Sequence, residues 1–464
     1  MRSFNPIYDQ LSRIPDHNFN VYLPEVILGG NNKHICGTGH LFTDNSRLKL
    51  KIINCAPPTI EEESINFLMS GGEGSSIGEL RSIEDYCYRM NAKDDHGNEY
   101  SCDFVEVEHD FDRIIYTCNF KTKISVFSSG GITNKVSNAA VVFKDKYSFA
   151  TNKSGFNKNV FPTYLDAIMD LKEVWNWETE GVSMILQKSL KYLHLDIQSE
   201  NLNIDNTMLK RIVDTLNFVM GIEHQYYYIV YFGDNNSFQV DITNNSKPSK
   251  NVLFTPPYRR TGSIGDEDVE NVKLFNSYYR YLEKRPDTIL NKLHKRIVDS
   301  GSGYYYKHGL VISTSIESIL KNYYPKDQEV LSEDFLADIQ QLKNYSNNLN
   351  NPMVTKRFKS FIEGLSVTGN YIPGKMLEKL ESEGVIGKGS LNVWRKLRNR
   401  YAHGDDFNEE LPKAVGLVMQ NTTIYYELIF NLIKYEGKYT SYSVTEGNKI
   451  KTYPIDRNDE SQIS

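Results

Sequence analysis

The residues best suited to chemistry lie in one stretch near the C-terminus, Gly389–His403, with the sequence GSLNVWRKLRNRYAH. Between Val385 and His403 there are five basic residues and no acidic one, in a chain of formal net charge −6. Arginine is a permanent cation whose fork of N–H donors fits phosphate, and histidine titrates near neutrality and can move protons. The stretch therefore predicts phosphodiester chemistry, in which a ribose 2′-hydroxyl attacks the adjacent phosphorus without a metal.

The spacing of these residues constrains how they meet on a helix. Asn399 and His403 are four residues apart and share one face. Arg398 is five residues from His403, which places it about 140° away around the axis of an unbroken helix. Arginine and histidine can therefore meet in two ways: the helix frays near Ala402–Gly404, or a second copy of the chain completes the site.

Several residues around this stretch allow two interpretations each. Arg395, Lys396, Arg400 and Tyr401 are candidate RNA-binding residues. A solvated helix face, with cations favourable near its C-terminal end, explains the same charges, and Tyr401 fits a dimer seam equally well. Trp394 is expected in the core or at an interface rather than beneath a base. Glu317 could hold Arg398 or His403, or form an ordinary ion pair between helices.

Six segments with helical periodicity must position the stretch. They cover 309–324, 332–348, 352–367, 373–383, 388–403 and 408–435, and Pro, Gly and Asn breakers separate them. We expect Ser390 to cap the helix that carries the basic stretch and Gly404 to end it. Together the segments predict an all-α bundle over 301–450, followed by a tail over 451–464.

The first 300 residues predict a different kind of structure. Short β-branched or aromatic runs, such as 47–54, 100–107, 113–127 and 139–143, indicate a β-rich domain over 1–160. A mixed α/β extension over 161–265 contains a helix that Asp205 can cap and a hairpin in which YYYIVYF and FQVDI flank a turn. A helical connector over 266–300 follows. The predicted fold class is α+β: a β-rich N-terminal region, a mixed middle region and a C-terminal helical bundle.

Composition excludes several classes of protein. With 464 residues, 39% of them hydrophobic, the chain can bury a large core without a disulfide or metal staple. The N-terminus has no apolar signal segment and no run is long enough to span a membrane, so we expect a cytoplasmic protein with no membrane contact and no cofactor. Five cysteines without CxxC spacing favour reduced, packed thiols. A zinc site built from Cys87, His96, Cys102, His109 and Cys118 is the alternative.

The segment Arg398–His403 (RNRYAH) resembles the Rx4-6H motif of HEPN domains, in its RNxxxH form. Three further runs are similar to ApeA-type HEPN proteins: VWRKL at 393–397, SIESIL at 315–320 and YEGKYTSY at 435–442. The resemblance covers residues 300–450, whereas residues 1–300 match only in being a β-rich region ahead of a bundle.

This resemblance implies an abortive-infection effector of anti-phage defence: a metal-independent endoribonuclease, homodimeric through its bundle, that cleaves cellular RNA, with tRNA as the expected target. It implies that His403 is the acid–base residue, that Arg398 binds the phosphate and that Asn399 orients the histidine or the RNA backbone. The N-terminal region would sense a phage-derived trigger or restrain the nuclease. The alternative is a non-catalytic bundle that binds nucleotides or RNA, or that only dimerises.

Overall fold

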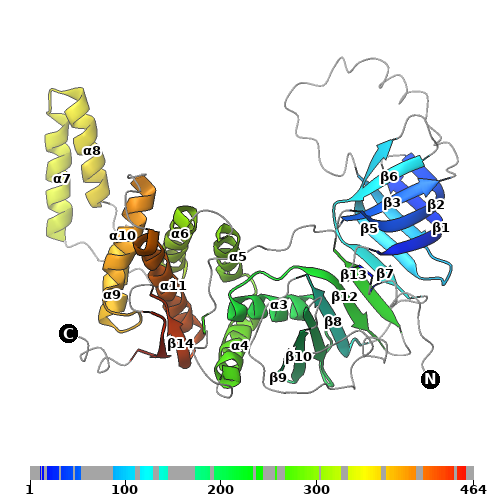
Figure 1. Ribbon diagram of the computed structural model, residues 1–464. Helices are drawn as coiled ribbons and strands as arrows, with labels where there is room; N and C mark the ends of the chain where they lie inside the picture. Colours follow the sequence, from blue (N-terminus) through cyan, green and yellow to red (C-terminus); the bar gives the residue numbers. More distant parts are fainter. Residues whose placement is uncertain are drawn as a thin grey trace, which may run out of the picture. The chain divides into compact units, whose positions relative to one another are not determined.

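The computed structural model divides the chain into two compact units (Figure 1). The first comprises Met1–Asn217, Glu223–Lys250 and Ser263–Val272, and the second Phe218–Ile222, Asn251–Gly262 and Lys273–Ser464. The structure describes residues 11, 13–14, 18–30, 33–44, 47–53, 87–109, 115–128, 135–144, 173–188, 193–233, 237–243, 257–258, 267–301, 305–324, 333–366, 373–403, 411–443 and 447–455. None of the helices in these ranges is long and apolar enough to cross a membrane.

The described strands of the first unit join into one antiparallel sheet. They are β1 (Asn20–Gly30), β2 (Lys33–Asp44), β3 (Arg47–Ile53), β4 (Tyr88–Lys93), β5 (Glu99–His109), β6 (Ile115–Phe120), β7 (Ile124–Phe127), β8 (Asn138–Phe143), β9 (Glu173–Thr179), β10 (Val182–Lys188), β11 (Leu193–Gln198), β12 (Tyr226–Phe232) and β13 (Phe238–Ile242). Their order is β4-β1-β2-β3-β6-β5-β7-β13-β12-β8-β11-β10-β9, and β4 also pairs with β5. That extra pairing closes β1 to β6 into a ring, from which the other strands continue as an open sheet.

Local sequence explains why the ring curls and closes. The register of β1 against β2 shifts between Leu23 and Val26, where Pro24 has no N–H to give to the ladder, and such a bulge bends a strand. On β2, a Cβ at Gly39 would lie 3.0 Å from side-chain atoms of both Leu50 and Val26, so a larger residue would have to push these side chains aside.

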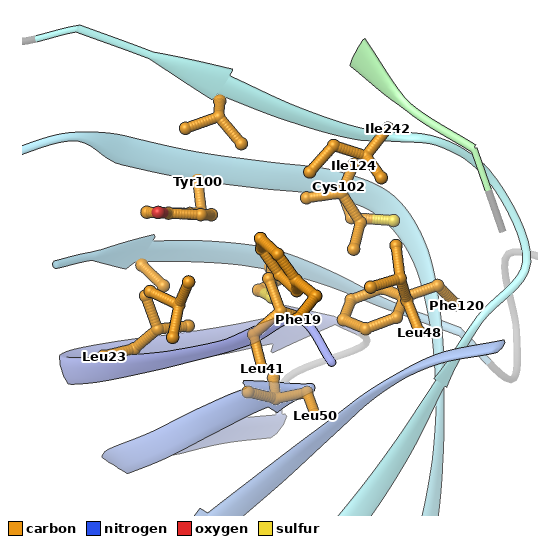
Figure 2. Packing of buried hydrophobic residues seen from close by; sticks show 14 of the residues in the cluster. Phe19, Leu23, Leu41, Leu48, Leu50, Tyr100, Cys102, Phe120, Ile124 and Ile242 are labelled. Atoms are coloured by element: carbon orange, nitrogen blue, oxygen red, sulfur yellow. The ribbon is translucent and has the colours of Figure 1, made fainter. Parts of the chain in front are cut away.

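The interior of the ring is apolar. In β3 the inward residues Leu48, Leu50 and Ile52 are buried and alternate with lysines. Figure 2 shows Leu48 and Leu50 packing with Phe19 and Phe120. The first unit therefore has an apolar core of its own.

The predicted β-rich N-terminal region is confirmed, but one predicted strand is in fact two and three strands were not predicted. The run predicted over 113–127 forms two strands, β6 and β7, because β7 leaves the ring to pair with β13. The hairpin β12–β13 forms as expected, and so does helix α3 (Asn206–Met220), whose Met208 N–H donates to Asp205 Oδ1 at 2.7 Å. Strands β9 to β11 were not foreseen, although β11 (LHLDIQ) alternates apolar and polar residues as a strand does; both its apolar and its polar residues are buried, except Gln198. The part of the middle region over 161–172 lies outside the described residues.

The second unit holds the C-terminal helices. They are α4 (Glu267–Lys284, from Lys273 on), α5 (Leu290–Ser300), α6 (Tyr305–Tyr323), α7 (Glu333–Asn347), α8 (Pro352–Ser366), α9 (Pro373–Ser382), α10 (Ser390–His403) and α11 (Leu411–Ile433). Each of the six predicted helical segments corresponds to one of the helices α6 to α11, with ends that differ by only a few residues. Helix α11 packs on α6 and α10, and α6 also contacts α10, α5 and α9. Helix α10 is therefore held on several sides.

The C-terminal region is not all-α, which corrects the prediction for 301–450 and for the tail. Strands β14 (Gly437–Ser441) and β15 (Lys449–Tyr453) pair antiparallel after the last helix. Their tyrosines Tyr439 and Tyr453 are buried and lie with ring centroids 5.4 and 5.5 Å from that of Phe430 on α11. The strand pair therefore covers the aromatic end of α11.

Candidate functional site

The start of α10 is fixed by a carboxylate from the preceding helix. Glu381 on α9 accepts hydrogen bonds from the backbone N–H groups of Gly389 (2.8 Å, at Oε1) and Leu391 (3.1 Å, at Oε2). The first N–H groups of a helix have no partner within it, so this carboxylate acts as the cap. The sequence predicted Ser390 for that role, but Ser390 is already the first helical residue. Gly389 has φ +86°, a conformation that favours glycine.

One face of α10 is packed into the unit. Trp394 and Leu397 are buried, and the Trp394 indole N–H donates to the carbonyl oxygen of Ser313 on α6 at 3.4 Å. This confirms that Trp394 is a core residue rather than a platform for a base. Asn421 on α11 donates to the carbonyl oxygen of Val393 at 3.4 Å. These contacts fix the rotation of α10 and decide which residues face outward.

Arg398 is held in place by a carboxylate from α6. Its Nε–H donates to Glu317 Oε1, and the same atoms form an ion pair. Its guanidinium carbon also lies 5.7 Å from the centre of the Trp394 ring, close enough for a cation–π contact. The Arg398 side chain is 42% exposed and that of Glu317 is 26% exposed. Because the hydrogen bond uses Nε, it orients the guanidinium on a side chain that is partly exposed.

The outer face of α10 is polar and basic. Arg395, Lys396 and Asn399 are exposed. A Cβ at Gly374, near the start of α9, would come within 3.2 Å of Arg395 Nη2, so the Arg395 guanidinium lies directly over that glycine. The structure thus places two arginines of the basic stretch on defined supports, Arg398 on Glu317 and Arg395 on Gly374.

The last turn of α10 is described only in its backbone. The helix continues to His403, so Asn399 and His403 share one face, and Arg398 lies about 140° from His403 around the axis. The side chains of Arg400, Tyr401 and His403 lie outside the described residues, as does Gly404. The convergence of Arg398 and His403 therefore remains a prediction.

A buried glutamate on α11 supports the segment just before α10. The sequence did not point to this residue. Glu427 on α11 is 2% exposed. It accepts hydrogen bonds from the Gly387 backbone N–H at 2.9 Å and from the Tyr439 hydroxyl at 2.7 Å. The available signal was its isolation, since it is the one acidic residue within the apolar run IYYELIF.

The zinc alternative finds no support among the described side chains. In the part of the chain that the structure describes, no group of three or more His, Cys, Asp or Glu residues could hold a metal ion. The Cys102 sulfur lies 3.3 Å from the Thr122 hydroxyl, and Cys118 is buried in the ring core. The side chain of His109 is outside the described residues.

Comparison with known proteins gives no relative: no protein-family model, no curated protein and no solved structure matches this chain. The function must be argued from the chain itself.

Proposed function

We propose that this protein is an endoribonuclease whose site is the outer side of α10, with Arg398, Asn399 and His403 as its working residues. The observation that carries the proposal is the Arg398–Glu317 pair. A carboxylate bound to Nε orients the guanidinium. The Arg398 side chain is 42% exposed, and the same helix carries exposed Arg395 and Lys396. A pre-oriented guanidinium suits a phosphodiester better than a freely moving one, because less entropy is lost on binding.

The proposed reaction is an internal transfer at phosphorus. The ribose 2′-hydroxyl gives its proton to a base, and its oxygen forms a bond to the adjacent phosphorus. The bond from phosphorus to the 5′-oxygen breaks, and that oxygen takes a proton from an acid. His403 exchanges these protons, because imidazole titrates near neutral pH. Arg398 neutralises the charge that grows on the phosphoryl oxygens. The products are a 2′,3′-cyclic phosphate and a 5′-hydroxyl.

In this proposal Arg398 and His403 lie on the same helix but on different faces, so their meeting needs a further step. The last turn of α10 unwinds locally, or a second copy supplies the missing group to a composite site. Lys396, Arg395, Arg400 and Tyr401 then contact the RNA on either side of the cleaved bond. Glu317 acts as a positioning residue for Arg398.

The resemblance to ApeA-type HEPN proteins extends the proposal to a biological role. The protein would act in the cytoplasm as an abortive-infection effector, with tRNA as the expected substrate. The first unit would sense a phage-derived trigger or restrain the nuclease. This role depends on the motif residues Arg398–His403 and on the bundle that follows the β-rich region.

The test compares full-length wild type with His403→Ala and Arg398→Ala on labelled tRNA and mRNA, with extracts of phage-infected cells as activator. We expect each variant to lose about 100-fold or more of the cleavage rate. Matched Lys343→Ala, which removes an exposed cation on α7, should leave the rate unchanged. Cleavage by wild type should survive EDTA. If wild-type protein binds RNA under these conditions but yields no cleavage product, the protein is a binding module and not a nuclease.

A further inference from the structure

Two side-chain contacts fix how α6 and α10 lie against each other. The Trp394 indole N–H donates to the carbonyl oxygen of Ser313. One turn further along both helices, the Arg398 Nε–H donates to Glu317 Oε1. The step is four residues on each helix, from 313 to 317 and from 394 to 398, so the two helices run in the same direction where they touch. A residue of α6 can therefore be matched with the residue of α10 at its level.

The next turn of α6 carries a lysine at the level of the candidate histidine. Lys321 follows Glu317 by four residues, which is a rise of about 6 Å along the axis and a rotation of about 40° around it. The same step on α10 leads from Arg398 to Ala402, which precedes His403. Lys321 therefore lies beside the last turn of α10, on the flank of α6 that carries Glu317.

The charge of Lys321 is not balanced within the fold. A glutamate four residues before a lysine is at the spacing that favours an ion pair along a helix. In the part of the chain that the structure describes, however, Glu317 forms its ion pair with Arg398, and the exposed Lys321 forms none. Two cations therefore share one carboxylate, and a positive charge is left over beside the guanidinium.

We propose that Lys321 binds the RNA phosphate next to the one at Arg398, so that the strand follows the C-terminal ends of α6 and α10. One helical turn separates Glu317, which holds the guanidinium, from Lys321, and this is comparable with the separation of neighbouring phosphates along a strand. An ammonium group on a flexible stem binds phosphate as a point charge and needs no planar fit.

This inference rests on the proposed function, because it takes Arg398 as the group that binds the phosphate at the cleaved bond. It adds a requirement on the substrate. A dinucleoside monophosphate has a single phosphate and can occupy only one of the two cations. An RNA chain that continues beyond the cleaved bond can occupy both. Lys321 then contributes to binding of the chain and not to the breaking of the bond.

A lysine in the last turn of a helix also has an ordinary structural explanation. A cation there interacts favourably with the partial negative charge of the helix C-terminus. That role predicts a loss of stability when Lys321 is removed, with unchanged RNA binding. Exposed Lys307 supplies the matched control, because it lies in the first turn of the same helix, about 21 Å along the axis from Lys321.

The test measures RNA binding separately from cleavage. Every protein is full-length and carries His403→Ala, which removes the proposed acid–base group. Each is titrated against a fluorescein-labelled single strand of about 12 ribonucleotides, by fluorescence anisotropy at about 50 to 300 mM NaCl. Lys321→Ala should weaken binding about five-fold and lower the slope of log Kd against log salt by about 0.7, the share of one phosphate contact in a single strand.

Two further variants make the result specific. Lys321→Arg should keep the affinity and the slope, because it retains the cation. Lys307→Ala should leave both unchanged. In the background with His403 intact, Lys321→Ala should raise KM for the same RNA about five-fold and leave kcat within about two-fold, as expected for a contact made equally before and during the reaction.

The inference is overturned if Lys321→Ala binds RNA like Lys307→Ala, or if the protein with His403→Ala does not bind this RNA at the lowest salt. Lower thermal stability of Lys321→Ala with unchanged RNA binding would assign the lysine to the end of α6 instead. The proposed nuclease fails on a different result, the absence of cleavage products with wild type. A binding module without cleavage would still show the loss of slope in Lys321→Ala.

Discussion

In the first unit a buried carboxylate binds groups of its own turn or of the neighbouring strand, whereas in the second unit carboxylates reach across to other elements. Asp94 accepts hydrogen bonds from the Asn98 backbone and side chain and from the Tyr100 hydroxyl, all within the turn and strand that follow it. Asp241 on β13 binds Ser125, on the paired strand β7, at 2.8 Å. It also binds Lys123, which lies just before that strand, at 2.5 Å.

In the second unit, three carboxylates from other helices bind α10 or the segment just before it. Glu317 from α6 holds Arg398, Glu381 from α9 caps the start of α10, and Glu427 from α11 holds Gly387 in the lead-in. A sheet fixes the register of its strands through backbone hydrogen bonds, but packed helices have no such ladder between them. Side chains must therefore fix the axial position of a helix, and here they do so for the helix that carries the candidate site.

The largest expected effect is that of Glu427→Ala. It leaves the Gly387 N–H and the buried Tyr439 hydroxyl without the acceptor they use, which should cost about 3 kcal/mol of the free energy of unfolding. Urea unfolding of the second unit measures this loss. Glu436→Ala, an exposed glutamate of the same region, should cost less than about 0.5 kcal/mol. Equal effects of the two substitutions would show that the hydrogen bonds of Glu427 add nothing to the stability of the second unit.

Acidification should weaken both units, because each buries neutral histidine. Burial lowers the pKa of His224 in the first unit to about 3 and that of His308 in the second to about 4. Below pH 6.5 the unfolded chain binds protons that the folded chain excludes, so stability present above pH 6.5 is lost as the pH falls toward 4.

Between pH 7 and pH 5 the loss should be about 2 kcal/mol for each histidine, measured as urea midpoints of the two units. His308→Gln should flatten the pH profile of the second unit alone. The first unit provides the control, since its profile in His308→Gln should stay as in wild type. An unchanged profile for His308→Gln would show that another group governs the acid response.

Glu317→Ala tests whether a carboxylate in the second unit serves chemistry as well as stability. We expect kcat for RNA cleavage to fall about ten-fold, because the guanidinium of Arg398 loses its orientation. Both partners are partly exposed, so the free energy of unfolding should change by less than about 1 kcal/mol. A drop in stability with unchanged kcat would make Glu317 a purely structural residue.

The smallest expected effect is that of Glu381→Ala, which removes the cap of α10. Loss of a helix cap should cost about 1 kcal/mol. The matched change is Glu383→Ala, an exposed glutamate two residues further on, and it should be neutral. Thermal unfolding compares the two. If Glu383→Ala costs as much, the effect comes from the loss of a negative charge near the end of α9 and not from the cap.

The helices could be predicted from the sequence because periodicity and breakers are local signals. The bounds of α6 and α10 follow from apolar spacing that ends at Pro325 and begins after Gly389. Strand β11 was missed although LHLDIQ alternates apolar and polar residues; its burial on both faces, polar residues included, depends on tertiary structure. The pairing of β4 with β5 that closes the ring depends on tertiary structure, which no local pattern encodes.

Of the carboxylates that support α10, the sequence pointed to Glu317 but not to Glu381 or Glu427. Arg398 and Glu317 stood out because the basic stretch and the first bundle helix resemble a known motif, and the structure joins them. Glu381 was missed because its role depends on how α9 turns back onto α10. Ser390 was assigned the cap because its residue type suits that position, but a carboxylate from a neighbouring helix took the role.

Strand β5 belongs to both the ring and the open sheet. Its residues Glu99–Ser101 pair with β4 on one edge and with β7 on the other, and Val105–His109 pair with β6. The ring and the open sheet therefore cannot separate at β7 without breaking the ladder between β5 and β7. The first unit should melt as one cooperative body, and the amide protons of Tyr100 and Ser101 should exchange with deuterium only through its complete unfolding.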